Sequence, residues 1–425
     1  MITALSFLVV LTILVMVHEV GHLLAAKKLG IRVETFAIGF GPKIAGLRRG
    51  DTDYVVRLVP LGGYVQLGEA GQSEAFCPDS PHYGERPPFH KMIVASSGPL
   101  ANLLLALFVL FLVSLLGKST PVFMSRPAAV AWVAPASCAE KAGLKPGDVV
   151  TGVDGISVTT WGEMVRLMPL YERGVAMRIR RDGRSENLTL HHASRINAGL
   201  SAEERITVAA VTKGSPAQEA GILPGDVILS AGGSPVVAWS AFQAVIADAK
   251  APIPVAIERL GRTSVVHLAP RIDPHTGKAF AGISYAPEME TRKYPFPAAM
   301  ANGLSSFASM VSDSIGTFRG ILTGSLSPKL LGGPVAIAQA SGTVAKKGIM
   351  PLLSFLAFLS VQFAVFNLMP FFPIVDGGQI SIFLFEAARR RPLGRASLEW
   401  MLKAGWAAMA ALILFVTYND VARLF

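Results

Sequence analysis

Charged residues are scarce in this chain. Asp, Glu, Lys and Arg make up 16% of its 425 residues while 51% are hydrophobic, a balance that excludes a single ordinary soluble domain. The hydrophobic residues gather in four runs of roughly 20 residues, the length that crosses a bilayer. We therefore predict a polytopic α-helical membrane protein, whose four transmembrane helices lie in the segments 1–26, 97–117, 352–386 and 398–420.

Cysteine is almost absent. The two cysteines, Cys77 and Cys138, have no metal-site spacing, which argues against a disulfide framework and against cysteine-bound metal. The first hydrophobic run also lacks the basic start and the small-residue cleavage signal of a secretory signal peptide. We expect segment 1–26 to be a retained membrane helix.

The net charge of +10 comes without the basic–aromatic pattern of a nucleic-acid surface, so no nucleic-acid partner is expected. Basic residues instead cluster between the first two runs and between the last two. Under the positive-inside rule both connections, including region 27–96, are cytoplasmic. Both termini and the long segment between the second and third runs then lie outside, so Cys77 and Cys138 face opposite sides of the bilayer and cannot pair. The clustered residues are Lys27, Lys28, Arg32, Lys43, Arg48, Arg49, Arg57, Arg86 and Lys91, and then Arg389, Arg390, Arg391, Arg395 and Lys403.

The outer segment contains a repeat. The residues from Ser137 to Val150 recur from Ser215 to Ile228, each with an Ala-Gly followed by Pro-Gly-Asp and an apolar strand. Two copies are too few for a solenoid, so we predict two similar α+β domains, at 122–197 and 205–288. The pattern resembles the PDZ domain, which commonly binds peptide ends by strand addition.

The sequence His18-Glu19-Val20-Gly21-His22 carries the clearest chemical signal. On a helix, positions i and i+4 share a face, so both imidazoles can reach one metal ion while Glu19 addresses its water. Each ionisable group inside an apolar span costs on the order of 2.5–3.5 kcal/mol or more, which favours a functional site. Two interhelical hydrogen-bonding histidines are the structural alternative.

A hydrolytic zinc site takes three protein ligands and leaves one position for water. Asp376 is the expected third ligand, because it is polar, lies in the third hydrophobic segment and shares with His22 the half of the bilayer nearer the basic connections. Pro370, Pro373 and Gly377-Gly378 predict that no regular helix surrounds it. Asn367 is a candidate to hydrogen-bond the substrate or the developing oxyanion, with an interhelical role as the alternative.

A helical substrate must be unwound before its carbonyls can be attacked. Residues 54–67 read as β-structure that supplies an edge for a substrate strand, with Tyr54, Val55, Val56, Gly62 and Gly63 as contact candidates. A packing hairpin is the simpler alternative. Segment 295–326 has apolar residues at helical spacing and predicts an amphipathic helix on the outer membrane surface, either gating entry or acting as a strut.

Several motifs together resemble the site-2 proteases, intramembrane zinc metalloproteases of bacterial inner membranes among others. They are the His-Glu-x-x-His run, Gly39-Phe-Gly-Pro42, Pro60-Leu-Gly-Gly-Tyr64, Ser97-Gly-Pro-Leu-Ala-Asn102, the Asn367 to Asp376 segment and Leu331-Gly-Gly-Pro334. The resemblance implies Zn²⁺ bound by His18, His22 and Asp376, with Glu19 as catalytic base. It further implies a membrane re-entrant β-element after Gly39.

The resemblance also implies partners. Family members cut single-span membrane proteins such as anti-sigma factors already shortened by another protease, and some clear signal-peptide remnants. In their permuted PDZ domains the carboxylate-binding loop comes late, near Gly282-Ile283 in the second repeat; no comparable loop is evident in the first. This chain departs from the family at two points: the spacing from Asn367 to Asp376 is one residue longer, and Gln379 replaces a common histidine.

Two other functions compete with proteolysis. A non-enzymatic membrane scaffold that presents the PDZ-like domains would leave His18, Glu19 and His22 unexplained. A zinc-dependent transporter would use the same ligands, but it normally has more spans or repeats among them. Zinc content separates the scaffold from the other two, and peptide cleavage separates the protease from the transporter.

Overall fold

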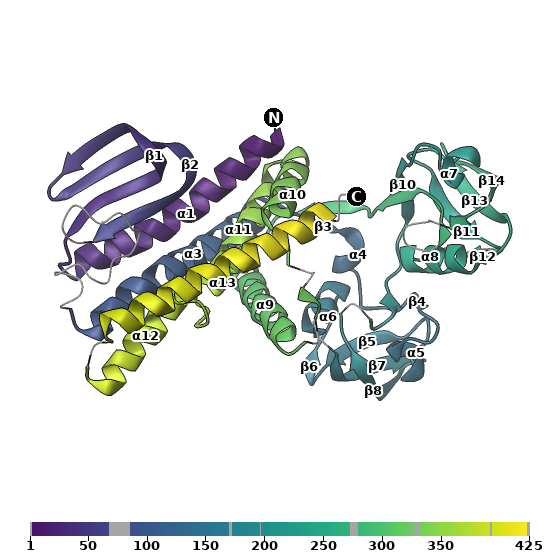
Figure 1. The fold of residues 1–425 in the computed structure, drawn as a ribbon. Helices are drawn as coiled ribbons and strands as arrows, with labels where there is room; N and C mark the ends of the chain where they lie inside the picture. The colour runs from purple at the N-terminus through teal and green to yellow at the C-terminus, as the bar shows by residue number, and fades with distance from the viewer. Residues whose placement is uncertain are drawn as a thin grey trace. The chain divides into compact units, whose positions relative to one another are not determined.

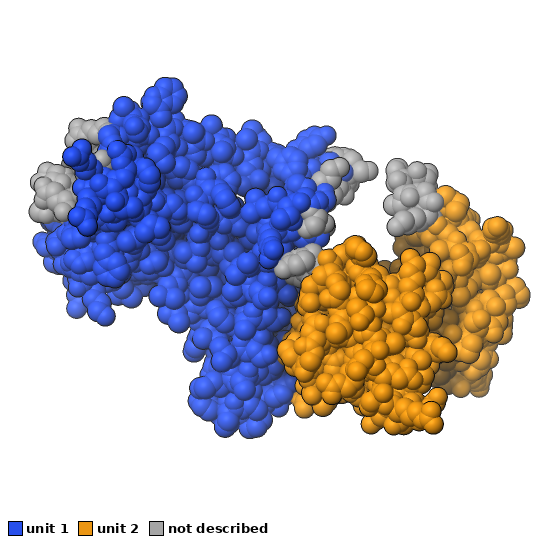
Figure 2. All heavy atoms as spheres, turned by 90° about the horizontal axis from the view of Figure 1, so that it is seen from below, with its two compact units in different colours: residues 1–118, 293–425 blue, residues 119–292 orange. Residues whose placement is uncertain are grey.

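The structure is a computed structural model, and it divides into two compact units, coloured separately in Figure 2. One unit comprises Met1–Lys118 and Lys293–Phe425, and the other comprises Ser119–Arg292. The structure describes residues 2–67, 86–169, 172–195, 197–272, 279–324, 326–328, 331–391 and 393–422. Cys138 is a free thiol, and Cys77 lies outside the described residues.

Four helices of the first unit are long and apolar enough to cross a membrane, which confirms the predicted polytopic architecture. They are α1 (Ile2–Lys28), α3 (Pro88–Leu116), α11 (Ile349–Asn367) and α13 (Arg395–Ala422). Helix α3 starts well before the predicted position 97, with Pro88 in its first turn, where a missing N–H is tolerated. Figure 1 shows α1 running alongside α3, on which α11 also packs.

Helix α1 packs on α3 at two glycines. A Cβ built on Gly21 would lie 2.3 Å from the carbonyl oxygen of Ser97, and one built on Gly98 would overlap the histidines of α1. Small residues at such crossings let two membrane helices approach closely. The buried stripe Val10, Leu14, His18 and His22 of α1 repeats every fourth residue, so the histidines continue the packed face.

The third predicted span is two helices rather than one. Helix α11 ends at Asn367, residues 368–375 are irregular, and α12 (Asp376–Arg389) begins at the aspartate. The break predicted from the prolines is present, but the glycines were wrongly assigned to it. Gly377 and Gly378 lie inside the first turn of α12, where a Cβ would come within 2.3 Å of the Leu368 carbonyl or 1.9 Å of the Phe372 carbonyl.

Two further helices complete the first unit. Helix α9 (Phe296–Leu322) covers most of the predicted amphipathic segment, and α10 (Pro334–Lys346) follows it. Small residues of α9 face α3: a Cβ on Gly303 would lie 3.0 Å from the backbone of Phe111. Several large apolar side chains of α9, among them Met300 and Leu304, are exposed, whereas Phe307 and Met310 pack against the core. This exposed face suits contact with lipid.

The β-structure of the first unit lies beside α1 (Figure 1) and consists of β1 (Val33–Arg49) and β2 (Thr52–Leu67). Both strands fold back, so residues 33–38 pair with 63–67 on one side and with 53–56 on the other. Residues 45–49 pair with the outer side of 52–56. Residues 62–67 therefore form one edge of this sheet, and 43–49 form the other.

The second unit holds the two repeats. The first repeat contains α4 (Val122–Ser125), β4 (Trp132–Val133), α5 (Cys138–Lys141), β5 (Val149–Val153), β6 (Ile156–Ser157), α6 (Trp161–Leu167), β7 (Arg173–Arg181), β8 (Arg184–Ala193) and β9 (Leu200–Ser201). The second contains β10 (Ile206–Val211), α7 (Pro216–Glu219), β11 (Val227–Ala231), β12 (Ser234–Pro235), α8 (Trp239–Asp248), β13 (Ile253–Arg259), β14 (Arg262–Leu268), β15 (Arg271–Ile272), β16 (Ala279–Phe280) and β17 (Ile283–Ala286). Short strands β3 (Lys118–Pro121) and β18 (Met289–Arg292) pair with each other. From β4 to β8 the order of helices and strands matches that from β10 to β14, and the second repeat then has β15 and β16 before its last strand. Each repeat has its own apolar core.

In each repeat, the aspartate of the Pro-Gly-Asp turn is buried and forms an ion pair with an arginine. In the second repeat Asp226, 1% exposed at its side chain, accepts hydrogen bonds of 2.6 and 2.7 Å from Arg259. Asp148 and Arg181 make the same contact in the first. The Arg259 guanidinium holds the pKa of the Asp226 carboxyl below its ordinary value, despite the opposing effect of burial.

Arg259→Met should destabilise the second repeat, because Asp226 would remain buried without its partner. Hydrogen exchange of β11 and β13 in the intact protein should become roughly tenfold faster or more. Arg262→Met, an exposed arginine across the same hairpin, is the matched control and should leave the exchange unchanged.

The same pair predicts a pH dependence. Because folding lowers the pKa of Asp226, its contribution to stability is present above the pKa of an unfolded aspartate and is lost as pH falls through the folded value. The difference in exchange between wild type and R259M should therefore shrink in acid. A difference that stayed constant down to strong acid would contradict this account of the pair.

Candidate metal centre

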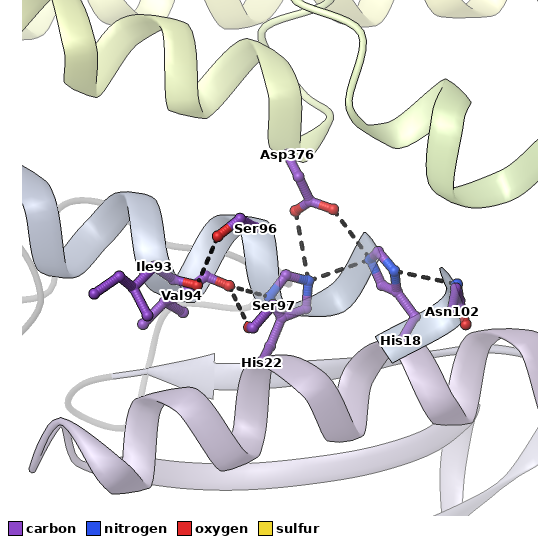
Figure 3. Close-up of polar contacts among 8 residues, drawn as sticks. All are labelled: His18, His22, Ile93, Val94, Ser96, Ser97, Asn102 and Asp376. Atoms are coloured by element: carbon purple, nitrogen blue, oxygen red, sulfur yellow. Dashed lines mark hydrogen bonds and ion pairs between the residues drawn. The ribbon is translucent and has the colours of Figure 1, made fainter. Parts of the chain in front are cut away.

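The two histidines of α1 point at the same place. His18 and His22 lie one turn apart, and their Nε2 atoms are 3.2 Å from each other. Their side chains are 9% and 5% exposed. Figure 3 shows both rings directed from α1 toward the start of α12. The i, i+4 spacing thus places two imidazole nitrogens together, as the sequence predicted.

Asp376 completes the group from the opposite side. Its Oδ2 lies 3.2 Å from Nε2 of His18, and its Oδ1 lies 3.5 Å from Nε2 of His22. As the first residue of α12 it sits where the helix dipole favours a negative charge. The irregular residues before it turn the chain so that this helix start faces α1.

The arrangement fits a zinc ion. Tetrahedral coordination with bonds of about 2.0–2.2 Å separates neighbouring ligand atoms by about 3.3–3.6 Å. The two imidazole nitrogens are 3.2 Å apart, each lies 3.2 or 3.5 Å from one oxygen of Asp376, and one ligand atom from each residue lies within 4.8 Å of the others. Although Asp376 Oδ2 is buried, it accepts no well-aligned hydrogen bond from the described residues. Two imidazoles and a carboxylate are also a donor set of hydrolytic zinc sites.

Helix α3 supports the histidines from behind. Nδ1–H of His22 donates a 2.8 Å hydrogen bond to the backbone carbonyl of Val94, which leaves Nε2 unprotonated and directed at Asp376. Gly98 allows both rings to lie against the α3 backbone, since a Cβ there would be 2.4 Å from Nε2 of His22 and 2.7 Å from Cε1 of His18. The positions of both histidine rings therefore depend on a glycine, Gly98, at this point of α3.

Glu19 faces the β-structure. Its carboxylate hydrogen-bonds the backbone of Val65, and a Cβ built on Gly63 would lie 3.3 Å from its Cγ. Gly62 and Gly63 belong to the edge segment of β2, which pairs on one side only with the strands that the structure describes. An open strand edge and the predicted catalytic base are therefore neighbours.

The other predicted contacts of the substrate strand need correction. Residues Tyr54, Val55 and Val56 pair with Phe36–Ile38 on one side and with Ala45–Leu47 on the other. A strand with both edges occupied cannot accept a further strand. The edge expected from this β-structure thus lies at 62–67 and not at 54–56.

Asn367 is not brought into a described hydrogen bond with the cluster. It is the last residue of α11, 9% exposed, and its Nδ2 is buried with no partner among the described residues. Its predicted role in stabilising an oxyanion stays a prediction. Phe363, one turn earlier on α11, instead meets His18 edge-on at 5.2 Å between ring centroids.

The first repeat does have a loop comparable to Gly282-Ile283, contrary to the expectation from sequence. Gly199 and Gly282 both have positive φ, of 75° and 79°, and each directly precedes a short strand. A Cβ on Gly199 would lie 2.3 Å from Cβ of Ser137, and one on Gly282 would lie 2.1 Å from Cβ of Ser215. Ser215 and Gly282 are further apart in the sequence than Ser137 and Gly199, so the constant offset between the repeats does not align the two glycines. The sequence signal that could have shown the match is the Ala-Gly before an aliphatic residue, which both repeats share.

Comparison with known proteins defines the class. Residues 6–412 match the model of Peptidase family M50, so the chain belongs to this family, and it is a site-2-type zinc metalloprotease. This assignment excludes the scaffold reading.

Individual relatives match over almost the full length. A protein of Neisseria meningitidis named as a zinc metalloprotease is 31% identical over 99% of both chains. The regulator of sigma-E protease RseP of Escherichia coli is 29% identical over 99% of this chain and 98% of its own. The regulator of sigma E protease of Haemophilus influenzae is 28% identical, with the same coverage.

Gly98→Ala should weaken zinc binding by roughly tenfold or more, because the methyl group would displace the rings of His18 and His22. The measurement is zinc bound per purified protein at limiting metal. Gly394→Ala is the matched control, since a Cβ there meets no atom within 4 Å. Full zinc in G98A would show that the rings do not need this close approach.

Proposed function

We propose that this protein hydrolyses peptide bonds in or next to the transmembrane segments of single-span membrane proteins, as a step of regulated intramembrane proteolysis. The observation that carries the proposal is the cluster of His18 and His22, on a helix long and apolar enough to span a bilayer, with Asp376 at the start of α12. The substrates proposed are anti-sigma factors already shortened by another protease, with signal-peptide remnants as a second group. The names of the relatives in Escherichia coli and Haemophilus influenzae support the sigma-E setting.

His18, His22 and Asp376 would hold the zinc ion. When bound, zinc polarises the scissile carbonyl and lowers the pKa of water at its open position. A Glu19 carboxylate oxygen accepts the proton of the attacking water and returns it to the leaving amine nitrogen. The Val65 backbone orients that carboxylate.

The edge segment 62–67 would hold the substrate. A transmembrane helix hides its carbonyls in its own hydrogen bonds, and pairing with a strand edge exposes them in an extended conformation. Because Gly63 and Val65 neighbour Glu19, a strand added there passes next to the catalytic base. This places the scissile bond without any further unfolding machinery in the first unit.

The protein would reside in a bacterial inner membrane with the metal centre toward the cytoplasmic side. The basic residues before α3 and around the α12–α13 connection support this orientation. The second unit is then extracytoplasmic. Its repeats would act as PDZ domains that take peptide termini, at Gly282-Ile283 in the second repeat, where β17 is an edge strand of its sheet.

The decisive experiment compares wild type with Glu19→Gln on a single-span substrate in detergent, with zinc measured in both. Glu19→Gln should retain zinc, because Glu19 is not part of the ligand cluster, and its cleavage should fall by about 10²–10⁴-fold. His18→Ala should lose both zinc and cleavage.

Two results would contradict the proposal. Cleavage by Glu19→Gln at the wild-type rate would remove the proposed base. Zinc in wild type without cleavage of any single-span substrate, accompanied by zinc uptake into vesicles, would favour a transporter.

A further inference from the structure

A buried asparagine on α3 adjoins the metal centre without belonging to the ligand cluster. Asn102 is fully buried, and its side-chain amide nitrogen lies 3.5 Å from Nδ1 of His18 (Figure 3). Its Oδ1 has no hydrogen-bond partner among the described residues. A buried polar atom left unpaired is unfavourable by about 1–3 kcal/mol. We therefore look for a function that a polar side chain at position 102 would have.

Both histidines have a backbone acceptor on α3, and His18 also faces a polar side chain. A histidine that binds metal through Nε2 carries its proton on Nδ1, and that N–H needs an acceptor to fix the ring. His22 has the Val94 carbonyl, at 2.8 Å. The His18 ring likewise donates a hydrogen bond to the backbone carbonyl of Gly98, and in addition the side chain of Asn102 faces its Nδ1.

The amide can serve as that acceptor after a half-turn. The oxygen and nitrogen of an asparagine amide are nearly the same size, and their assignment follows the hydrogen-bond network. Turning the amide breaks no bond of Oδ1, because that atom has none among the described residues. It gives up the 3.5 Å contact of Nδ2 and places Oδ1 where the nitrogen lies. Nδ1–H of His18 then donates to Oδ1, and Nε2 is left with a free lone pair directed at Asp376.

We propose that Asn102 is the positioning residue of His18: its Oδ1 accepts the Nδ1 proton and so holds His18 in the tautomer that binds zinc. The inference rests on the proposed zinc site of His18, His22 and Asp376. It assigns Asn102 no contact with substrate or with the metal itself.

The packing around Asn102 suits such a role. The hydroxyl of buried Ser360 on α11 donates a 2.7 Å hydrogen bond to the Asn102 carbonyl, fixing this part of α3 against α11. Phe363, also on α11, packs edge-on against the His18 ring. The backbone of Asn102 and the ring of His18 are therefore both restrained. Only the side-chain amide of Asn102 has to rotate for Oδ1 to face Nδ1 of His18.

Two substitutions separate positioning from packing. Asn102→Leu keeps the volume and removes the acceptor, whereas Asn102→Asp keeps an acceptor oxygen in place. We expect Asn102→Leu to raise the zinc dissociation constant about 10–100-fold and Asn102→Asp to stay near wild type. A purely structural role gives the reverse order, since a buried apolar site tolerates leucine better than a charge.

The measurement is zinc competition against a chelator with the intact, detergent-solubilised protein, which needs no substrate. Gly394→Ala, whose added methyl group meets no atom within 4 Å, should leave zinc affinity unchanged; His18→Ala defines loss of the site. Wild-type affinity in Asn102→Leu beside a failing His18→Ala would overturn the role of Asn102 alone. Wild type without zinc would overturn the zinc site, and the inference with it.

Discussion

The structure depends on bringing the carboxylate of Asp376, at the start of α12, together with two imidazoles of the apolar helix α1. None of these groups is stable alone at that depth, and each is made tolerable by the other two and by the backbone of α3. Two features bring the three side chains together: α1 and α3 cross closely at Gly21 and Gly98, and α12 begins at Asp376. Gly98 is needed because the two rings occupy the space of its side chain, and Gly21 because the backbone of Ser97 does.

The same constraint shapes the approach of a substrate. Glu19 is one residue from a ligand, so its carboxylate leaves the helix on a different face and meets β2 instead of α12. Metal binding and the catalytic base therefore lie on different faces of the same turn of α1. One face of α1 holds the metal ligands against α3 and α12, and the other presents the base to an open strand edge.

Much of this was predictable from sequence, because polar residues in an apolar run stand out. His18, Glu19, His22 and Asp376 follow from that contrast, and so does the break before Asp376. The edge strand was misplaced because an alternating β pattern does not reveal which part of a folded-back strand is central; only the register shows that Tyr54–Val56 is paired twice. Asn102 belongs to the motif Ser97–Asn102, but its proposed role depends on its contact with His18, 84 positions away. A local sequence pattern does not show such a contact.

The order of the chain has a consequence for biosynthesis. His18 and His22 emerge from the ribosome early, yet Asp376 follows only after the whole of Ser119–Arg292 has been made. A growing chain therefore has two of the three cluster residues for most of its translation. Because both halves are required to enclose an ion, a truncated or stalled product carries no complete centre, and hydrolytic competence arrives only when the last third of the polypeptide has entered the bilayer.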